Sequence, residues 1–325
     1  MHNIVTITFS PCIDKSFSVE ELLAEKKLRA STPKLEPGGG GINVARVLIR
    51  LGANAVAVYP SGGHMGKTLD ELMTNEKVPA ISVETQNETR ENIVVLETLT
   101  NRQFRFTMPA VNLNETEVER MLEHIEQLKG LDFIVVSGSL PVGISPLVFS
   151  RINAIAGRQK AKVIVDSSGE MIKHAVYEGV FLIKPNVSEL AYLAGKQSLG
   201  ADEIAHEAKQ IIRTKKCEII VVSMGAAGAM LVTRNESILI KPPAVEIKST
   251  VGAGDSMVAG IVFALSRGRD IETAVKYGVA CGTATTLNDG TELCHKKDVE
   301  TLFNQICISP GSVLNADTIS STRAY

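Results

Sequence analysis

One segment of the sequence combines two glycines, a carboxylate and a long apolar run. Residues 248–265 read KSTVGAGDSMVAGIVFAL, in which Gly252 and Gly254 allow the backbone to approach a ligand closely. The run after Asp255 predicts a helix whose first N–H groups point back into the turn, where they can bind phosphate or developing negative charge. Asp255 is then placed to take a proton from an attacking hydroxyl. An acidic residue that caps a helix after a glycine turn explains the same pattern, and spacing alone favours neither interpretation.

A second glycine cluster lies at residues 36–52, EPGGGGINVARVLIRLG, where four successive glycines open an amphipathic helix. Four glycines lose much backbone entropy on folding, so a simple connector rarely needs them. They would let a polyhydroxy substrate lie against the backbone, with Asn43 offering a donor and an acceptor to sugar hydroxyls. The structural alternative is a flexible turn with Asn43 at the helix start.

Residues 184–190, KPNVSEL, place Asn186 three residues before Glu189 at the edge of a predicted strand. This pair is an ordinary capping box, which is the interpretation that the segment alone favours. The functional interpretation has Glu189 orient water on a magnesium ion and Asn186 lie near nucleotide phosphates. The presence of the two glycine motifs strengthens this second interpretation.

Charged residues elsewhere are weaker candidates. Asp14 follows the first predicted strand and could accept hydrogen bonds from sugar hydroxyls, although an Asx turn explains it equally well. Arg90 and Arg105 could grip a phosphate with their forked guanidinium groups. Most such charges in a near-neutral protein are solvated surface. The other basic residues of the same irregular regions are Lys27, Arg29 and Arg102.

Spacing argues against several other kinds of site. Residues 61–72, SGGHMGKTLDEL, end like a phosphate-binding P-loop, but that motif needs glycine where Ser61 stands. The six histidines lack metal-ligand spacing, and the turn at 137–139 is not a nucleophile elbow. The five cysteines are scattered without a C-x-x-C pair, which argues against a disulfide framework or a zinc site and favours a reducing compartment.

The composition is that of a compact globular domain of the size of an enzyme. The 325 residues are 44% hydrophobic and 22% charged, with a mean hydropathy of +0.11. Because 34 Lys and Arg nearly balance 36 Asp and Glu, the formal charge of −2 gives no global field for nucleic acid or an anionic membrane. No late apolar run approaches the ~20 residues of a membrane helix, and the start lacks a secretion-signal pattern. We expect a cytoplasmic protein with small-molecule ligands and neither nucleic acid nor membrane as partner.

The elements that must position these residues alternate along the chain. Short apolar, β-branched runs predict strands buried on both faces of a parallel sheet, at residues 3–9, 55–59, 133–137, 162–166, 180–183 and 218–223. Stretches with helical spacing lie between them, at residues 43–51, 115–128, 146–158, 202–214 and 257–266. This alternation predicts a doubly wound α/β fold.

Two regions interrupt the alternation, at residues 16–36 and 80–108. The second contains IVVLETLT and RQFRFTM, which are typical of consecutive strands with polar residues interleaved. We expect a small sheet apart from the main one, whose exposed face covers a ligand pocket or a second subunit. From residue 309 onward the sequence is polar and lacks periodicity, so we expect disorder there.

The order of the motifs is highly specific. PGGGGINVAR, SGSLP, VDSSGE, KPNVSEL, SMGAAG and STVGAGDS together resemble the ribokinase-like, PfkB-type carbohydrate kinases over about residues 3–307. The resemblance implies an α/β fold, a three-layer α/β/α sandwich with a central mostly parallel sheet and a small β-sheet lid. It implies a kinase domain at 1–308 with lid segments at about 15–36 and 80–108, then a tail at 309–325. Such lids often pair between subunits, so a homodimer through the lid is expected.

The resemblance also implies roles for matching positions. Asp255 corresponds to the catalytic base, and the amides of Gly252, Ala253 and Gly254 correspond to an anion hole. The positions that match contacts to the sugar phosphate are Asp14, Lys27, Gly39, Asn43, Arg90, Arg105 and Ser139, with Lys27 offered by the lid of a partner subunit.

Nucleotide and ion positions follow from the same resemblance. The nucleotide positions are Lys184, Asn186, Ser223, Gly225, Gly228, Val279 and Thr283, the last two at the adenine pocket. Glu189 matches the residue that holds Mg²⁺ through water. Related kinases hold a potassium ion beside the anion hole with backbone oxygens, and the matching positions are Ser249, Val251, Thr285, Asn288 and Gly290. Ser249 stands where many members of the family carry aspartate.

The implied reaction is transfer of the γ-phosphoryl group of ATP to the 1-hydroxyl of fructose 6-phosphate, a step of glycolysis, with Mg²⁺ and additionally K⁺ as ions. Kinases that act on fructose 1-phosphate or tagatose 6-phosphate share nearly all of these motifs, so both alternatives stay open. A non-catalytic sugar-phosphate-binding protein of the same fold is the alternative from another class. The presence of Asp255 with an intact G-A-G turn counts against it.

Overall fold

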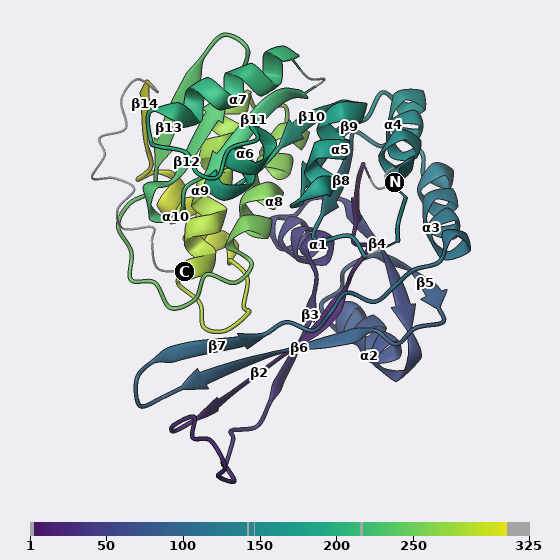
Figure 1. Cartoon of the computed structure of the whole chain (residues 1–325), viewed down its shortest axis with the longest axis vertical. Coiled ribbons are helices and arrows are strands. Elements are labelled where there is room, and N and C mark those ends of the chain that lie inside the picture. Colours follow the sequence, from purple (N-terminus) through teal and green to yellow (C-terminus); the bar gives the residue numbers. More distant parts are fainter. Residues whose placement is uncertain (1–2, 142, 146, 215–216, 311–325) are drawn as a thin grey trace.

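The computed structural model describes residues 3–141, 143–145, 147–214 and 217–310, which form two sheets and their flanking helices (Figure 1). The strands of the large sheet are β1 Ile4–Ile7, β4 Ala55–Gly62, β5 Ala80–Thr85, β8 Phe133–Ser137, β9 Lys162–Asp166, β10 Val180–Ile183, β11 Cys217–Ser223, β12 Ala229–Val232, β13 Ser237–Lys241 and β14 Cys307–Pro310. Their spatial order is β14-β13-β12-β11-β10-β9-β8-β1-β4-β5. From β11 to β5 neighbours run parallel, and β12, β13 and β14 extend one edge with antiparallel pairing.

Helices cover both faces of the large sheet. One face carries α3 Glu115–Gln127, α4 Leu147–Gln159, α5 Glu170–Glu178, α6 Val187–Leu193 and α7 Glu203–Thr214. The other face carries α1 Gly40–Leu51, α8 Ala253–Ser266, α9 Ile271–Thr286 and α10 Lys296–Phe303. Successive side chains of a strand alternate between these layers. In β8, Ile134 and Val136 pack in the first layer while Phe133 and Val135 pack in the second, which is why the run is apolar throughout. The predicted three-layer α/β/α sandwich with a mostly parallel sheet is confirmed.

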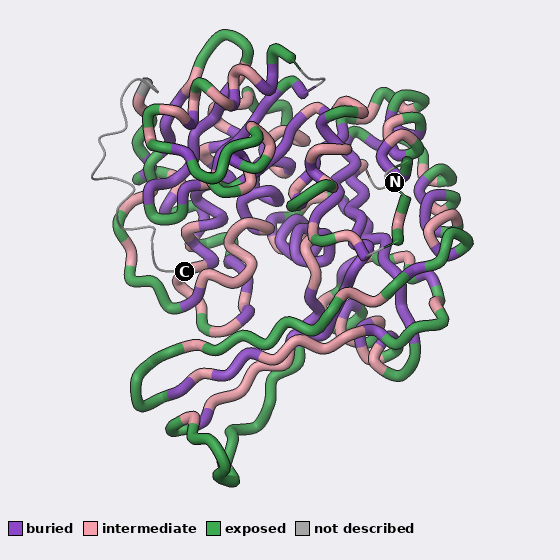
Figure 2. Tube along the Cα trace, in the orientation of Figure 1, coloured by how far each residue is buried: buried purple, intermediate pink, exposed green. Residues whose placement is uncertain are grey.

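The small sheet projects from one side of the sandwich (Figure 1). Its strands are β2 Cys12–Val19, β3 Lys34–Gly38, β6 Arg90–Glu97 and β7 Arg102–Phe106, in the order β3-β2-β6-β7. Helix α2, Gly63–Asn75, follows β4 and packs beside its base. Much of the small sheet is exposed or half-buried, in contrast to the strands of the large sheet (Figure 2).

The register divides the small sheet into a polar and an apolar face. Asp14 pairs with Asn92, and two residues further along β6 Val94 pairs with Arg105, so Asp14, Asn92 and Arg105 share one face. The opposite face carries the large apolar residues Phe17, Leu35, Ile93, Val95, Phe104 and Phe106, together with the charged residues Lys15, Glu91, Glu97 and Arg102.

The structure differs from the sequence-based expectation at three boundaries. Residues 80–85 were expected in the lid, but they form β5 and pair with β4 in the large sheet, where Val83 is buried in the core and Ile81 packs against it. The small sheet begins at Cys12, before the expected 15. Strand β14 continues to Pro310, beyond the expected domain end at 308, and residues 311–325 of the expected disordered tail lie outside the described residues.

Within the described ranges, every helix is too short or too polar to cross a lipid bilayer.

Candidate active site

Asp255 lies in the first turn of α8, just after a turn that only glycine fits well. Gly252 is the N-cap residue with φ of 74°, in the left-handed region, and a Cβ there would collide with Leu293. The carboxylate of Asp255 accepts a hydrogen bond from Asn43 Nδ2 at 2.9 Å and one from Ser137 Oγ at 3.2 Å. Three elements, α8, α1 and the end of β8, therefore hold one carboxylate at a helix N-terminus.

The surroundings of this carboxylate make it a stronger base than an exposed aspartate. Desolvation in the site, together with repulsion from Asp166, raises the pKa of Asp255 to about 7. The hydrogen bonds from Asn43 and Ser137 and the attraction of Lys184 oppose this rise. A carboxyl group with this pKa is ionised to a large extent at neutral pH and is still basic enough to accept a proton.

A buried ion pair lies beside the same turn. Lys184 follows β10 and its Nζ is 3.2 Å from Asp166 Oδ1, at the end of β9. Burial alone would lower the pKa of Lys184, but attraction by Asp166, Glu189 and Asp255 raises it, so the ammonium stays charged. A Cβ on Gly254 would lie 3.5 Å from Nζ. The cation therefore lies beside Gly254 and adds positive charge to the anion-binding turn.

The four-glycine run begins α1 against the ends of β1 and β8. A Cβ at Gly40 would collide with Ser137 Oγ and with the backbone nitrogen of Gly138. Gly39 is the N-cap of α1. Close packing thus accounts for part of the run, and it brings Asn43 in the first turn of α1 to Asp255.

The polar face of the small sheet brings several predicted sugar-phosphate residues toward the site. Asp14 is nearly buried and accepts hydrogen bonds from Asn92 Nδ2 at 3.1 Å and from the Cys12 thiol at 3.4 Å. Burial raises the pKa of Asp14, and these two hydrogen bonds oppose the rise. Arg105 on β7 donates to Thr250 Oγ1 at 3.2 Å, which joins the small sheet to the segment before the glycine turn.

Three other residues expected at the sugar phosphate, Arg90, Lys27 and Ser139, lie at the edges of this region. Arg90 donates to the carbonyls of Met108 at 2.6 Å and Ser10 at 3.2 Å, and its Nε has no hydrogen-bond partner among the described residues. Lys27 is exposed in the β2–β3 connection, which lies at the far end of the small sheet (Figure 1). Ser139 is exposed beyond the end of β8.

The predicted nucleotide residues gather at the ends of β10 and β11. Asn186 caps α6 and forms the full capping box with Glu189, with both hydrogen bonds at 2.8 Å. A backbone bridge joins Asn186 to Ser223. Gly225 and Gly228 begin and close the turn between β11 and β12.

The adenine-pocket positions lie on α9. Val279 is 1% exposed and packs in the core between α8, α9 and the large sheet. Thr283 is half-buried and its hydroxyl donates to the Val279 carbonyl at 2.8 Å. Thr283 is thus nearer the surface than Val279, whose side chain is part of the packed interior.

The segments expected to hold a monovalent cation lie side by side. Lys248 N donates to the Thr286 carbonyl at 2.8 Å, and Ser249 Oγ donates to the Gly290 carbonyl at 2.6 Å. Val251 N donates to Ser249 Oγ at 3.3 Å. Thr285 and Asn288 belong to the same stretch, at the end of α9 and just beyond it.

Four residues of this site were given no role by the sequence reasoning: Ser137, Asp166, Asn92 and Arg46. Asp166 and Ser137 each end a buried apolar strand, and polar residues at the carboxyl ends of parallel strands are a signal that could have identified them. Asn92 acts through Asp14, which is distant in sequence, and its local sequence carries no comparable signal. Arg46 ends the glycine-rich motif and bonds both the nearby Asn43 and the more distant Glu76, a contact that the motif does not indicate.

Comparison with known proteins agrees with this geometry. A model of the pfkB family of carbohydrate kinases matches residues 3–298. The chain is 38% identical to ATP-dependent 6-phosphofructokinase isozyme 2 of Escherichia coli (strain K12) over 304 residues, which are 93% of this chain and 98% of that protein. It is 30% identical to 1-phosphofructokinase of Borreliella burgdorferi over 305 residues, which are 93% of this chain and 97% of that protein.

Solved structures show the same similarity. Phosphofructokinase-2 from Escherichia coli in complex with potassium matches with a TM-score of 0.89 and 39% identity, covering 94% of this chain and 99% of that one. The same Escherichia coli protein in complex with fructose-6-phosphate and in a tetrameric inhibited form matches with a TM-score of 0.87, 37% identity and the same coverage.

Proposed function

Because the chain belongs to the pfkB family of carbohydrate kinases, we propose that it transfers the γ-phosphoryl group of ATP to the 1-hydroxyl of fructose 6-phosphate, giving fructose 1,6-bisphosphate and ADP. The observation that carries this proposal is the carboxylate of Asp255 at the N-terminus of α8, beside a glycine turn and the buried ammonium of Lys184. The higher identity to a 6-phosphofructokinase than to a 1-phosphofructokinase favours fructose 6-phosphate over fructose 1-phosphate.

In this reaction Asp255 takes the proton of the 1-hydroxyl as the oxygen attacks the γ-phosphorus. Hydrogen bonds from Asn43 and Ser137 hold its carboxylate in one orientation. The amides of residues 252–254 and the ammonium of Lys184 stabilise the negative charge on the transferred phosphoryl oxygens. Positioning supplies most of the rate, because phosphoryl transfer needs little covalent chemistry from the protein.

Magnesium, when bound with ATP, would neutralise part of the negative charge of the phosphate groups. The carboxylate of Glu189 fits the role of holding a water molecule of that ion, since Glu189 is half-buried and lies near the charged Lys184. Its hydrogen bond in the capping box of α6 uses one carboxylate oxygen, Oε2. The stretches 249–251 and 285–290 fit a potassium ion, because they bring uncharged backbone oxygens together beside the glycine turn. The potassium complex of the Escherichia coli protein supports this assignment.

We also propose that the small sheet is a lid over the sugar-phosphate site and a dimer interface. Its polar face carries Asp14 and Arg105, and the contact of Arg105 with Thr250 supports closure onto the glycine turn. Its other face exposes large apolar side chains, including 36% of Phe104 and 48% of Phe106, and such a face suits burial by a second subunit. Lys27, far out on the lid, would then reach the site of the partner, so that a dimer completes two sites.

The remaining assignments concern extent and location. We propose a single kinase domain that ends with β14, followed by a polar tail, and a protein that works in the cytoplasm. The five cysteines, all within the described residues, are unpaired, which supports a reducing compartment.

An ADP-release assay tests the proposed reaction across fructose 6-phosphate, fructose 1-phosphate, tagatose 6-phosphate and ribose. The highest kcat/KM is expected with fructose 6-phosphate, and product analysis should give the 1,6-bisphosphate. A clear preference for fructose 1-phosphate or tagatose 6-phosphate would reassign the substrate within the family. Binding of a sugar phosphate without ADP release from any of the four would favour the non-catalytic alternative.

A further inference from the structure

Among the described residues, the largest fully buried side chain is charged: Arg46 on α1, which is 1% exposed. Its guanidinium has five N–H donors and no acceptor. Donors on Nε and Nη2 bind the two carboxylate oxygens of Glu76, with 2.9 Å from Nε to Oε2. The other three reach Glu36 Oε1 at 3.3 Å, the Pro37 carbonyl at 2.8 Å and Asn43 Oδ1 at 3.2 Å. Every donor therefore has an acceptor, and the guanidinium is held in one position.

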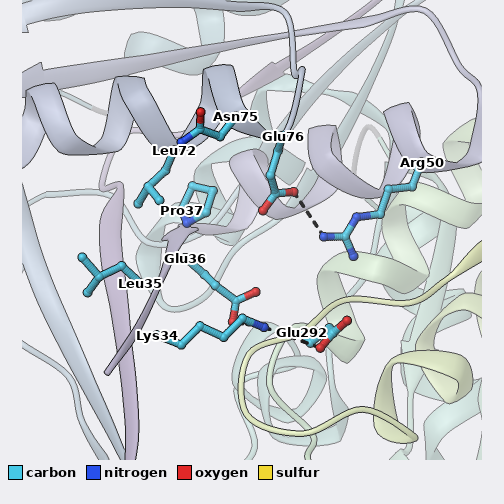
Figure 3. Close-up of a pocket in the computed structure, with 9 residues that line it drawn as sticks. All are labelled: Lys34, Leu35, Glu36, Pro37, Arg50, Leu72, Asn75, Glu76 and Glu292. Carbon is cyan, nitrogen blue, oxygen red and sulfur yellow. Dashed lines mark hydrogen bonds and ion pairs between the residues drawn. The ribbon is translucent and has the colours of Figure 1, made fainter. Parts of the chain in front are cut away.

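The two carboxylates that hold Arg46 are fixed from other elements. Thr291, in the segment after α9, donates to Glu36 Oε2 at 2.5 Å. Arg50, one turn further along α1, donates to Glu76 Oε2 at 3.1 Å. A cavity of about 420 Å³ lies beside the carboxylates of this network and is lined in part by Glu36, Arg50 and Glu76 (Figure 3). The network thus has a solvent-facing end at Glu76 and an inner end at Arg46, which is closed to solvent.

The inner end determines which way the side-chain amide of Asn43 faces. A guanidinium can only donate, so the oxygen Oδ1 of Asn43 must face Arg46. The amino group Nδ2 then faces Asp255, where it donates to Oδ2 at 2.9 Å. A flipped amide would place its oxygen against a carboxylate and its amino group against a guanidinium, and both contacts would be repulsive.

We propose that Arg46 is a positioning residue for the phosphoryl transfer, because it fixes the amide of Asn43 with Nδ2 toward Asp255 and so keeps the catalytic carboxylate in one orientation. This inference rests on the proposed role of Asp255 as the base. It explains why α1 buries a full positive charge one turn after Asn43 and surrounds it with two carboxylates. If packing were the only requirement, apolar side chains of similar volume could take the place of this buried ion pair without loss of stability.

The test replaces Arg46 with lysine and uses a matched control on the same helix. Arg46→Lys keeps the charge between Glu36 and Glu76, but a single ammonium cannot also reproduce the planar contact with Asn43. Arg50→Lys changes the neighbouring partner of Glu76 and leaves Asn43 untouched. We expect Arg46→Lys to lower kcat by about 10-fold to 100-fold with the KM for ATP nearly unchanged, since small misplacements of reacting groups have effects of this size. Arg50→Lys should retain kcat within about twofold.

A double-mutant cycle separates positioning from a general structural effect. If Arg46 acts through the amide of Asn43, then Arg46→Lys should change kcat by less than about twofold when Asn43 is already alanine. An equal loss in both backgrounds, or an equal loss in Arg46→Lys and Arg50→Lys, would overturn the proposal. Should Arg46→Lys fail to fold, Glu76→Gln replaces it in the cycle, because it weakens two of the five contacts of the guanidinium. The same dependence on Asn43 is then expected with a smaller loss.

The pH profile gives a second readout. Losing the hydrogen bond from Asn43 raises the pKa of Asp255, so the acid limb of kcat/KM should move to higher pH in Arg46→Lys and stay in place in Arg50→Lys. The other charged or titratable groups that act on Asp255 are Asp166, Lys184 and the Cys12 thiol, and none of them is altered in these variants. The wild type and Asp255→Asn are measured alongside. If the wild type turns over and Asp255→Asn does not, the proposed function is supported even if Arg46 proves to have no positioning role.

Discussion

Replacing Asp255 with asparagine should reduce catalysis and increase stability at the same time. Asparagine keeps the size of the side chain and can still accept from Asn43, but it cannot take a proton from a hydroxyl. General base catalysis is worth about 10²-fold to 10⁴-fold, so kcat should fall by that factor while ATP still binds. In the wild type, kcat/KM should fall as the pH drops below about 7, because protonation of Asp255 removes the base.

The stability change follows from the same carboxyl group. Its pKa is raised from 3.8 to about 7 on folding, so the folded state binds a proton more tightly than the unfolded chain does. The charged form therefore destabilises the fold fully above pH 7, and this destabilisation disappears as the pH falls toward 3.8. Three pKa units at 1.36 kcal/mol each give about 4 kcal/mol, which asparagine should recover at pH 8.5. At pH 5.5 about half of that gain should remain.

Urea unfolding of the wild type and Asp255→Asn at pH 8.5 and 5.5 measures this gain, and the ADP-release assay measures kcat on the same samples. Ser137→Ala is the matched control, since it alters the same carboxylate without removing its charge. The reasoning would be refuted if Asp255→Asn turned over nearly normally. The electrostatic part of the reasoning would be refuted if Asp255→Asn were no more stable than the wild type at pH 8.5. It would also be refuted if the difference in unfolding free energy between the variant and the wild type were larger at pH 5.5 than at pH 8.5.

Three further changes test other parts of the site. Glu189→Gln should raise the Mg²⁺ concentration for half-maximal activity by about tenfold and leave the melting temperature unchanged, since glutamine also serves in a capping box; an unchanged Mg²⁺ requirement would remove the metal role. Arg105→Ala should raise the KM for fructose 6-phosphate by about tenfold with the KM for ATP unaffected, and equal effects on both would argue for a structural role. Gly40→Ala should lower kcat by about 10²-fold because its Cβ would collide with Ser137, whereas Gly157→Ala, which has open space around it, should retain full activity. Similar kcat values in these two glycine variants would contradict the packing argument.

The sequence could predict the elements that have a clear pattern. The strands at 133–137 and 162–166 could be predicted because buried parallel strands are apolar throughout. The helices at 115–128 and 202–214 could be predicted because one face of each helix carries an apolar stripe. Helix α9 had no such stripe, since residues on most of its faces, from Ala274 to Ala284, are buried between α8, α10 and the large sheet. The assignment of 80–85 to the lid failed because a polar alternating strand at the edge of the large sheet has the same pattern as a strand of a small exposed sheet.

The site was predictable residue by residue but not as a network. The local motifs indicated Asp255 and Asn43, and the resemblance added Lys184. Asn43 and Asp255 are nevertheless 212 residues apart, and no local pattern shows that they hydrogen-bond. The sequence and the resemblance both suggested Arg90 as a phosphate residue, but neither indicated that its guanidinium also donates to the backbone carbonyls of Met108 and Ser10. Such contacts depend on how the helices and the lid pack, which the sequence of one segment does not determine.

The two glycine clusters have a common physical purpose. The glycine at 252 lets α8 begin with its amides at the anion site, and the glycine at 40 lets α1 begin against Ser137 without collision. Helices that begin at the same edge of the sheet bring the first-turn residues Asn43 and Asp255 together, and Ser137 itself completes the contact to the carboxylate. A side chain at either glycine would therefore act on the base through the start of a helix. Each glycine motif thus sets the geometry of the proton acceptor in addition to binding a ligand.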